Sequence, residues 1–489
     1  MKQRKLFWIL NFILGGYFLY RIIDQSKILR IFPLNYTNDV GSYMASLFFM
    51  AKCGLNNLCP YWYNGFVAFT TYSPGWQFFT MPFYWITNNI LTATWISWIL
   101  MFILGFIFIL ILGKNERWNL SKIIFFFLFL FGNAVAVGGF IREGRMPAMF
   151  GFVFILAMFA LVLYYKNRDL DWKFFVYLIL IEVPLILSHP QEALLGQFLL
   201  LGLFLIKNLK EKIKIAIGVV LSLLITMFWW LPFIKNLGNN NILGNVQGGW
   251  IWVFSGTELL TQVVGFLVPL ALLILFYFYY KQKKSILFFS PILALALLFM
   301  LRLTPFIPFL RNISPDPFIM LFLIFVLYFL LSIRLFPKFI EKMLPVLLIM
   351  IVLFSVGISH FKTPYFWEYT QGEYDMLELL PYGGDRFFMV YTAPKTSHPK
   401  SFYAYVPIYY NYTTPGGFYP QIPTKEYDDL LYELPKMVFD GNCERTNELI
   451  NELNINYLFA YASYCDRLKE CGYENIRNSG KACLFYSGR

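Results

Sequence analysis

Long apolar runs recur along this chain, and they constrain its fold more than any other feature. A run of about 20 apolar residues is what a helix needs to cross a bilayer. Of the 489 residues, 58% are hydrophobic and only 14% are charged, which a soluble globular domain does not explain. We therefore predict a polytopic α-helical membrane protein with about eleven transmembrane helices, at 6–23, 92–112, 121–138, 147–165, 173–187, 191–206, 213–231, 259–280, 285–301, 316–333 and 343–359.

Lysine and arginine are concentrated in every second connection between these runs, beginning with the N-terminus. Basic residues of short connections mark the cytoplasmic side, so the N-terminus is predicted to lie inside. The alternation requires that 76–90, which contains Pro82, lies at the membrane interface instead of crossing it. We expect a multi-pass protein of the cell membrane. Its net charge of +12 then follows from topology, and we expect no nucleic-acid partner.

The composition changes near His360. Residues 1–359 hold the apolar runs and a large first outer loop, 24–91, whereas residues 360–489 mix charged residues with Gly, Pro and Tyr. In this tail, the pattern predicts a helix over 446–453, a buried strand over 457–461 and a last strand over 482–486. We therefore predict a transmembrane domain followed by a small C-terminal extracytoplasmic α/β domain.

All six cysteines fall on the predicted outer side. An even number of cysteines in an oxidising compartment indicates disulfides. Cys53 and Cys59 would close a small loop in the first outer segment. The tail cysteines allow three pairings, which the sequence leaves open: Cys443, Cys465, Cys471 and Cys483.

Ionisable side chains gather in the predicted outer connections, whereas the apolar runs hold few, Glu182 among them. Such groups at membrane depth are costly, so a functional role is the first hypothesis. Structural roles stay open: Asp39 could cap a helix that begins near Val40, Glu143 could pair with Arg145, and arginines could bind lipid headgroups. The residues concerned are Asp39, Arg142, Glu143, Arg145, His189, Glu192, Arg302 and Arg311.

The order of these features resembles the GT-C superfamily of polytopic glycosyltransferases, which use polyprenyl-phosphate-linked sugars. In that superfamily an N-terminal span precedes a large outer loop with an acid near its start, here Asp39 in YTNDVGSYM. The segment Tyr72–Gly75 (YSPG) resembles the Y-x-P-G turn of oligosaccharyltransferase-like members. The IREGRMP and SHP motifs resemble those of archaeal 6-pyruvoyl-tetrahydropterin synthase-related membrane proteins. The D-P-W-Y form of the first loop is absent, which argues against protein oligosaccharyl transfer.

The resemblance implies an inverting glycosyltransferase that moves a sugar from a polyprenyl-phosphate donor to a glycan, lipid or protein acceptor at the outer face. Asp39 would be the general base, with Glu143 as the next candidate. Two alternatives remain: a transporter or flippase for a lipid-linked substrate, and a non-catalytic surface-assembly protein. Arginines would bind the lipid phosphate: Arg142, Arg145, Arg302 and Arg311.

A divalent metal is a further possibility at the same side. Carboxylates with one histidine suit Mg²⁺ or Mn²⁺. The predicted ligands are Asp39, Glu143, His189 and Glu192.

Overall fold

The computed structural model describes residues 2–30, 39–133, 138, 144–236, 259–283, 285–333, 337–361, 371–390, 398–419 and 422–488.

Each of the eleven predicted apolar runs overlaps a helix. Seven helices are long and apolar enough to cross a membrane. The number eleven and the inside–outside assignment stay predictions. The helices are α1 (Lys2–Gln25), α4 (Ile90–Asn115), α5 (Leu120–Gly132), α7 (Met146–Tyr165), α8 (Trp172–Ser188), α9 (Pro190–Ile206), α10 (Leu209–Asn236), α12 (Leu259–Lys283), α13 (Ile286–Met300), α14 (Pro315–Ser332) and α15 (Lys338–Phe361).

Helix α7 lies in the middle of the bundle. It is buried along almost its whole length and packs against α4, α8 and α9. Small residues allow close approach in this bundle: a Cβ at Gly151 of α7 would lie 2.7 Å from the Cβ of Glu192 on α9. Small residues at helix contacts let apolar helices associate closely where burial from water gives little driving force.

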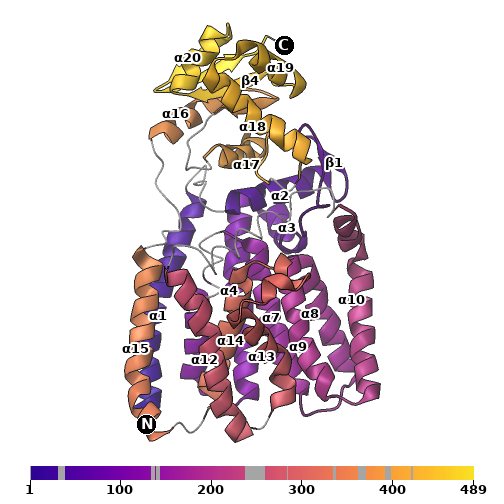
Figure 1. Cartoon of the computed structure of the whole chain (residues 1–489), viewed down its shortest axis with the longest axis vertical. Coiled ribbons are helices and arrows are strands. Elements are labelled where there is room, and N and C mark those ends of the chain that lie inside the picture. Colours follow the sequence, from indigo (N-terminus) through magenta and orange to yellow (C-terminus); the bar gives the residue numbers. More distant parts are fainter. Residues whose placement is uncertain are drawn as a thin grey trace.

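Two shorter helices and a small hairpin lie between the bundle and the C-terminal part of the chain (Figure 1). They are α2 (Val40–Cys53), α3 (Gly75–Thr87) and the two-stranded sheet of β1 (Leu58–Cys59) and β2 (Phe66–Val67). The 13 residues of α3 extend over about 20 Å, less than the ~30 Å hydrocarbon layer. This length agrees with the interfacial position expected for 76–90. A short η1 (Ser26–Leu29) follows α1.

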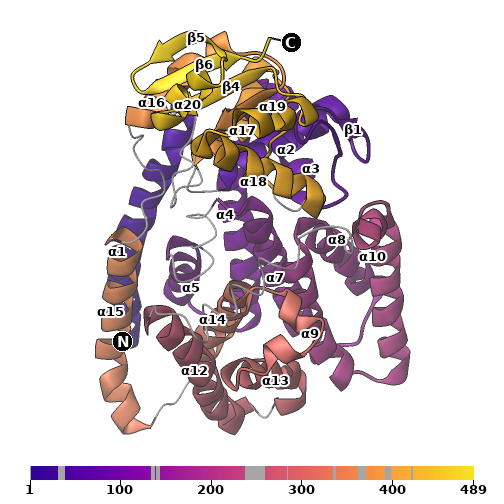
Figure 2. The same ribbon diagram turned by 45° about the horizontal axis from the view of Figure 1, so that its top comes forward.

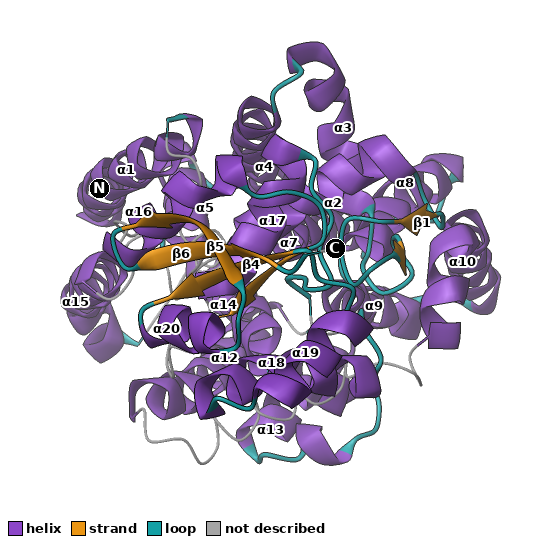
Figure 3. Ribbon diagram, turned by 90° about the horizontal axis from the view of Figure 1, so that it is seen from above, coloured by secondary structure: helices purple, strands orange, loops and turns teal. Residues whose placement is uncertain are grey.

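The C-terminal segment, which is the described part of 371–488, contains a four-stranded sheet with the order β3-β4-β6-β5. The β3–β4 pair is parallel and the other pairs are antiparallel. The predicted helix 446–453 corresponds to α19, and the predicted strands correspond to β4 and β6. Figure 3 shows this sheet from above, over the ring of helices. The elements are α16 (Gln371–Leu379), η5 (Leu380–Tyr382), β3 (Phe387–Val390), α17 (His398–Tyr410), α18 (Lys425–Asp440), α19 (Cys443–Glu452), β4 (Tyr457–Tyr461), α20 (Ser463–Glu470), β5 (Glu474–Ser479) and β6 (Ala482–Tyr486).

Three disulfides are present, as the cysteine count predicts. The first closes the small loop between α2 and β1. The other two select one of the three pairings that the sequence leaves open, and they fasten α19 and β6 to the two ends of α20. The bonds are Cys53–Cys59, Cys443–Cys471 and Cys465–Cys483.

The C-terminal segment packs directly onto the first loop, with α17 against α2 (Figure 2). The indole of Trp62 donates a 2.7 Å hydrogen bond to the backbone carbonyl of Tyr403. A Cβ at Gly41 would lie 2.7 Å from the hydroxyl of Tyr405, so glycine permits this contact. Residues more than 300 positions apart therefore share one buried interface.

Candidate active site between the bundle and the C-terminal segment

Asp39 directly precedes α2, where a helix-capping residue would stand. Its side chain makes no capping hydrogen bond. Its backbone carbonyl instead accepts hydrogen bonds from the Ser42 hydroxyl at 2.6 Å and from the Tyr43 N–H at 3.2 Å. The capping alternative for Asp39 is therefore wrong, and the acid at this position needs another explanation.

Tyr43 lies one helical turn after Asp39 and is almost completely buried. Its ring packs against the rings of Tyr72, Trp76 and Tyr419, with centroids 6.4, 6.2 and 6.1 Å away. Such aromatic clusters are rigid and exclude water. The cluster joins α2, α3, the loop between them and the C-terminal segment.

The electrostatic surroundings of Tyr43 show which charges lie near it. Burial raises the pKa of the Tyr43 phenol well above its usual value. Tyr72 and the negative charge of Asp39 raise this pKa further, the positive charge of Arg145 lowers it, and the negative charge of Glu192 raises it. Charges influence one another over short distances only. Three predicted site residues from separate connections, Asp39, Arg145 and Glu192, therefore influence one buried phenol.

His189 and Glu192 form a pair at the turn between α8 and α9. His189 Nδ1 lies 2.6 Å from Glu192 Oε2. The Glu192 side chain is almost fully buried, and its Oε1 atom has no hydrogen-bond partner in the described part of the chain. A buried oxygen of this kind is costly unless something binds it. The pair thus presents one unsatisfied acceptor close to the Tyr43 cluster.

The Tyr72–Gly75 turn rests on the turn that carries His189. The Ser73 hydroxyl donates a 2.6 Å hydrogen bond to the carbonyl of Ser188. A Cβ at Gly75 would lie only 2.5 Å from the carbonyl oxygen of Leu187, so no larger residue fits there without a shift. The turn that resembles Y-x-P-G therefore holds the two loops together.

The start of α14 joins the same region. Arg145 forms a 3.6 Å ion pair with Asp316, which lies in the first turn of α14. Gln191 Oε1 accepts hydrogen bonds from the Ser314 hydroxyl at 2.8 Å and from its N–H at 3.3 Å. Arg145 therefore has an acidic partner in Asp316, whereas the predicted alternative of a pair with Glu143 falls outside the described residues.

The remaining predicted arginines have different positions. Arg302 and Arg311 are exposed in the segment between α13 and α14, which contains η3 (Thr304–Phe306) and η4 (Leu310–Asn312). Arg142 and Glu143 lie outside the described residues. Among the described predicted phosphate ligands, Arg145 influences the same buried phenol as Asp39 does.

No group of three or more His, Cys, Asp or Glu side chains is arranged to hold a metal ion among the residues that the structure describes. His189 and Glu192 contact each other, and Glu143 is outside those residues. The predicted Mg²⁺ or Mn²⁺ site thus stays a prediction, and no step proposed below depends on a metal.

Glu182, the acid expected within an apolar run, is fully buried in α8 and accepts a hydrogen bond from Gln197 of α9. It therefore links two helices, which gives it a structural role.

Tyr43, Trp76 and Tyr419 belong to the site but were not predicted. Tyr43 could have been found, because residues four apart share one face of a helix and Asp39 directly precedes that helix. Tyr419 carries no local signal, since its position follows from the packing of a segment more than 370 residues away.

The fold of this chain is similar to that of solved GT-C superfamily membrane glycosyltransferases, the superfamily that the sequence resembles. The oligosaccharyltransferase of Archaeoglobus fulgidus, solved with zinc and sulfate, matches it with a TM-score of 0.54 and 10% identity, over 91% of this chain and 68% of that one. Arabinofuranosyltransferase AftD from mycobacteria matches with a TM-score of 0.55 and 11% identity, over 97% of this chain. This chain spans 40% of that protein's length.

A further structure of the archaeal enzyme, AglB of Archaeoglobus fulgidus with an inhibitory peptide and a dolichol-phosphate, matches with a TM-score of 0.50 and 9% identity, over 92% of this chain and 69% of that one. No family model and no curated protein matches the sequence. At such low identity the likeness defines the fold, and the function has to be argued from the site.

Proposed function

We propose that this protein transfers a sugar from a polyprenyl-phosphate-linked donor to an acceptor at the outer face of the membrane. The observation that supports the proposal is the electrostatic influence of Asp39, Arg145 and Glu192 on the buried Tyr43 phenol, in a fold shared with glycosyltransferases. A base for the acceptor hydroxyl and a cation for the departing phosphate are the groups that this reaction requires.

In the proposed reaction an acceptor hydroxyl attacks C1 of the donor sugar in a single displacement. The new bond joins the acceptor oxygen to C1, and the bond from C1 to the phosphate oxygen breaks. The Asp39 carboxylate takes the hydroxyl proton. The phosphate leaves with the bonding electron pair, and Arg145 stabilises its charge, together with the other predicted arginines. Attack from the side opposite to the phosphate inverts the configuration at C1.

The dolichol-phosphate in the AglB structure supports a lipid-linked donor, because that ligand belongs to a protein of the same fold. A transporter is less well supported. It would place ionisable groups along its spans, and the one expected there, Glu182, already links α8 to α9.

The test is transfer of labelled sugar in liposomes, with polyprenyl-phosphate hexoses and pentoses as donors. Asp39→Asn keeps the size of the side chain but removes the proton acceptor, so transfer should fall about 10²- to 10⁴-fold. Asp466→Asn, an exposed acid on α20, is the matched control and should be silent. Thermal unfolding should be unchanged in both variants. Normal transfer by Asp39→Asn would remove Asp39 from the mechanism.

A further inference from the structure

A cleft lies beside the candidate active site. It opens between the first loop, the end of α10 and the segment that leads into α18, and has a volume of about 530 Å³. Clefts of roughly 300–1,000 Å³ are typical of small-molecule sites. The residues that matter for its chemistry are Tyr63, Phe66, Thr70, Thr71, Asn236 and Tyr427.

The lining of this cleft has a particular chemistry. Aromatic rings alternate with hydroxyl and amide groups, and none of the described residues that line it carries a charge. An anionic headgroup or a phosphate would require cations, and a lipid tail would require a continuous apolar surface. A neutral, hydroxyl-rich ligand with flat apolar faces fits both the rings and the hydrogen-bonding groups. A saccharide has these properties.

The walls of the cleft are held in place before any ligand arrives. Tyr63 donates a 2.7 Å hydrogen bond to the carbonyl of Tyr419. The Tyr427 hydroxyl donates to the carbonyl of Pro415 at 3.1 Å and accepts from the Asn64 amide at 3.1 Å. A preformed site loses less entropy on binding than a flexible one. The cleft is therefore suited to recognition.

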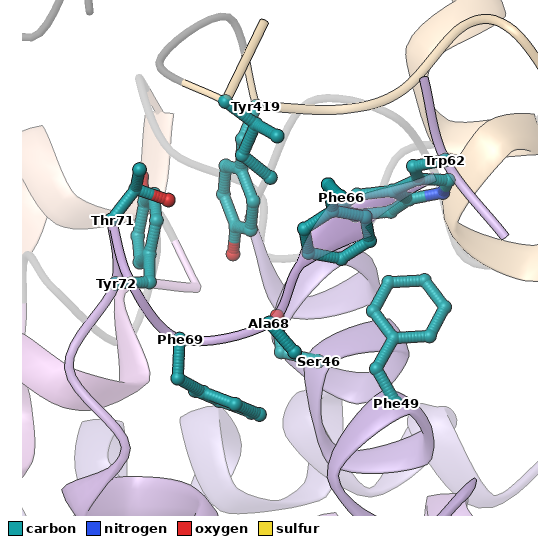
Figure 4. Close-up of a pocket in the computed structure, with 10 residues that line it drawn as sticks. Ser46, Phe49, Trp62, Phe66, Ala68, Phe69, Thr71, Tyr72 and Tyr419 are labelled. Carbon is teal, nitrogen blue, oxygen red and sulfur yellow. The ribbon is translucent and has the colours of Figure 1, made fainter. Parts of the chain in front are cut away.

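Thr71 is the group best placed to contact a ligand. It is half-buried, and its hydroxyl makes no hydrogen bond within the described part of the chain. It lines the open cleft and also the small inner pocket drawn in Figure 4, where it stands near Tyr72 and Tyr419.

The inner pocket shares lining residues with the cleft and is also lined by Tyr72 and Tyr419, which pack against Tyr43. Phe66, Thr71 and Ile422 line both spaces. At the inner end, the hydroxyl oxygens of Ser42 and Tyr419 lie 2.6 Å apart, and the Ser42 hydroxyl donates to the carbonyl of Asp39. The inner pocket holds only about 20 Å³, room for roughly one water molecule. The cleft thus suits sugar units that do not themselves react.

We propose that the acceptor is a saccharide and that this cleft binds its non-reacting sugar units. The inference rests on the proposed glycosyltransferase function and names the acceptor class for that site. The rings of Phe66 and Tyr427 would stack on sugar faces, and Thr71 and Asn236 would bind sugar hydroxyls.

The test measures binding without a donor. The full-length protein in nanodiscs is titrated with uncharged linear di- to hexasaccharides of hexoses and pentoses, and binding is followed by saturation-transfer NMR and native mass spectrometry. Thr71→Val keeps the shape and removes one hydrogen bond, so affinity should fall about 3- to 10-fold. Phe66→Leu should weaken binding through loss of the ring face. Thr92→Val, on α4, is the matched control and should bind normally.

Uncharged peptides of similar size are the competing probe. The inference is overturned if saccharides bind equally well to the cleft variants and the control, or if only peptides bind and Thr71→Val weakens them. The experiments distinguish a wrong assignment of the cleft from a wrong assignment of the transfer reaction. Asp39→Asn should reduce transfer by the factor given above and leave saccharide affinity unchanged. If Thr71→Val transfers sugar to a peptide or a lipid with a normal KM, the assignment of the cleft to a saccharide acceptor is wrong. The proposed transfer reaction is then unaffected.

Discussion

The hydroxyl of Ser73 donates a 2.6 Å hydrogen bond to the backbone carbonyl of Ser188, although 115 residues separate them. This bond joins the turn before α3 to the turn between α8 and α9. The same contact brings Gly75 against Leu187, with no room for a side chain. The position of His189 relative to the Tyr43 cluster therefore depends on this contact.

Gly75→Ala should destabilise the protein and reduce transfer. The added methyl would lie 2.5 Å from a backbone oxygen, so the loops must separate, at a cost of about 1–3 kcal/mol. Gly16→Ala is the matched control, because a Cβ there meets nothing within 4 Å. Alanine favours a helix over glycine by about 1 kcal/mol, so the control should be neutral or stabilising. Thermal unfolding in detergent measures the stability of both variants. Equal changes in the unfolding temperature of Gly75→Ala and Gly16→Ala would contradict the close contact between Gly75 and Leu187.

His189 and Glu192 should be energetically coupled. His189→Ala leaves the Glu192 carboxylate buried without its hydrogen-bond partner, which should cost about 1–3 kcal/mol of unfolding free energy. Glu192→Gln in the same background removes the charge and should recover part of that loss. A double-mutant cycle should give a coupling energy of about 0.5–3 kcal/mol. Additive effects of the two substitutions would show that the pair does not interact.

Stability should fall at alkaline pH because of Tyr43. Its pKa is raised by burial, whereas the unfolded phenol titrates near pH 10. Above about pH 10 the unfolded chain loses a proton that the folded chain retains, so the folded state becomes progressively less stable. Tyr43→Phe should reduce this loss. Tyr432 is exposed, so Tyr432→Phe should leave this loss of stability unchanged. Unfolding midpoints measured across the alkaline pH range compare the two variants.

Peptide mapping of unreduced protein should find Cys443 linked to Cys471 and Cys465 linked to Cys483. Replacing both cysteines of either bond with serine should cost about 2–4 kcal/mol, because each bond closes a loop of moderate length. The Cys53–Cys59 bond spans only six positions and should contribute less. A peptide in which Cys443 is joined to Cys465 would contradict the fold of the C-terminal segment.

Local patterns were sufficient for much of the fold. Each apolar run became a helix, because a long apolar run has few alternatives to an internally hydrogen-bonded helix in lipid. The strands β4 and β6 and helix α19 were predicted closely, since apolar periodicity over a few residues reports burial directly.

Long-range packing decided the remainder. The tail cysteines could pair in three ways, and only the antiparallel pairing of β6 with β4 and the position of α20 select one. The loss of the capping role for Asp39 depends on the geometry at the start of α2. Tyr419 reaches Tyr43 because the C-terminal segment folds back onto the first loop. A sequence determines which segments must be buried, but the partner of each buried side chain is chosen by the shape and chemistry of surfaces that meet only in the folded chain.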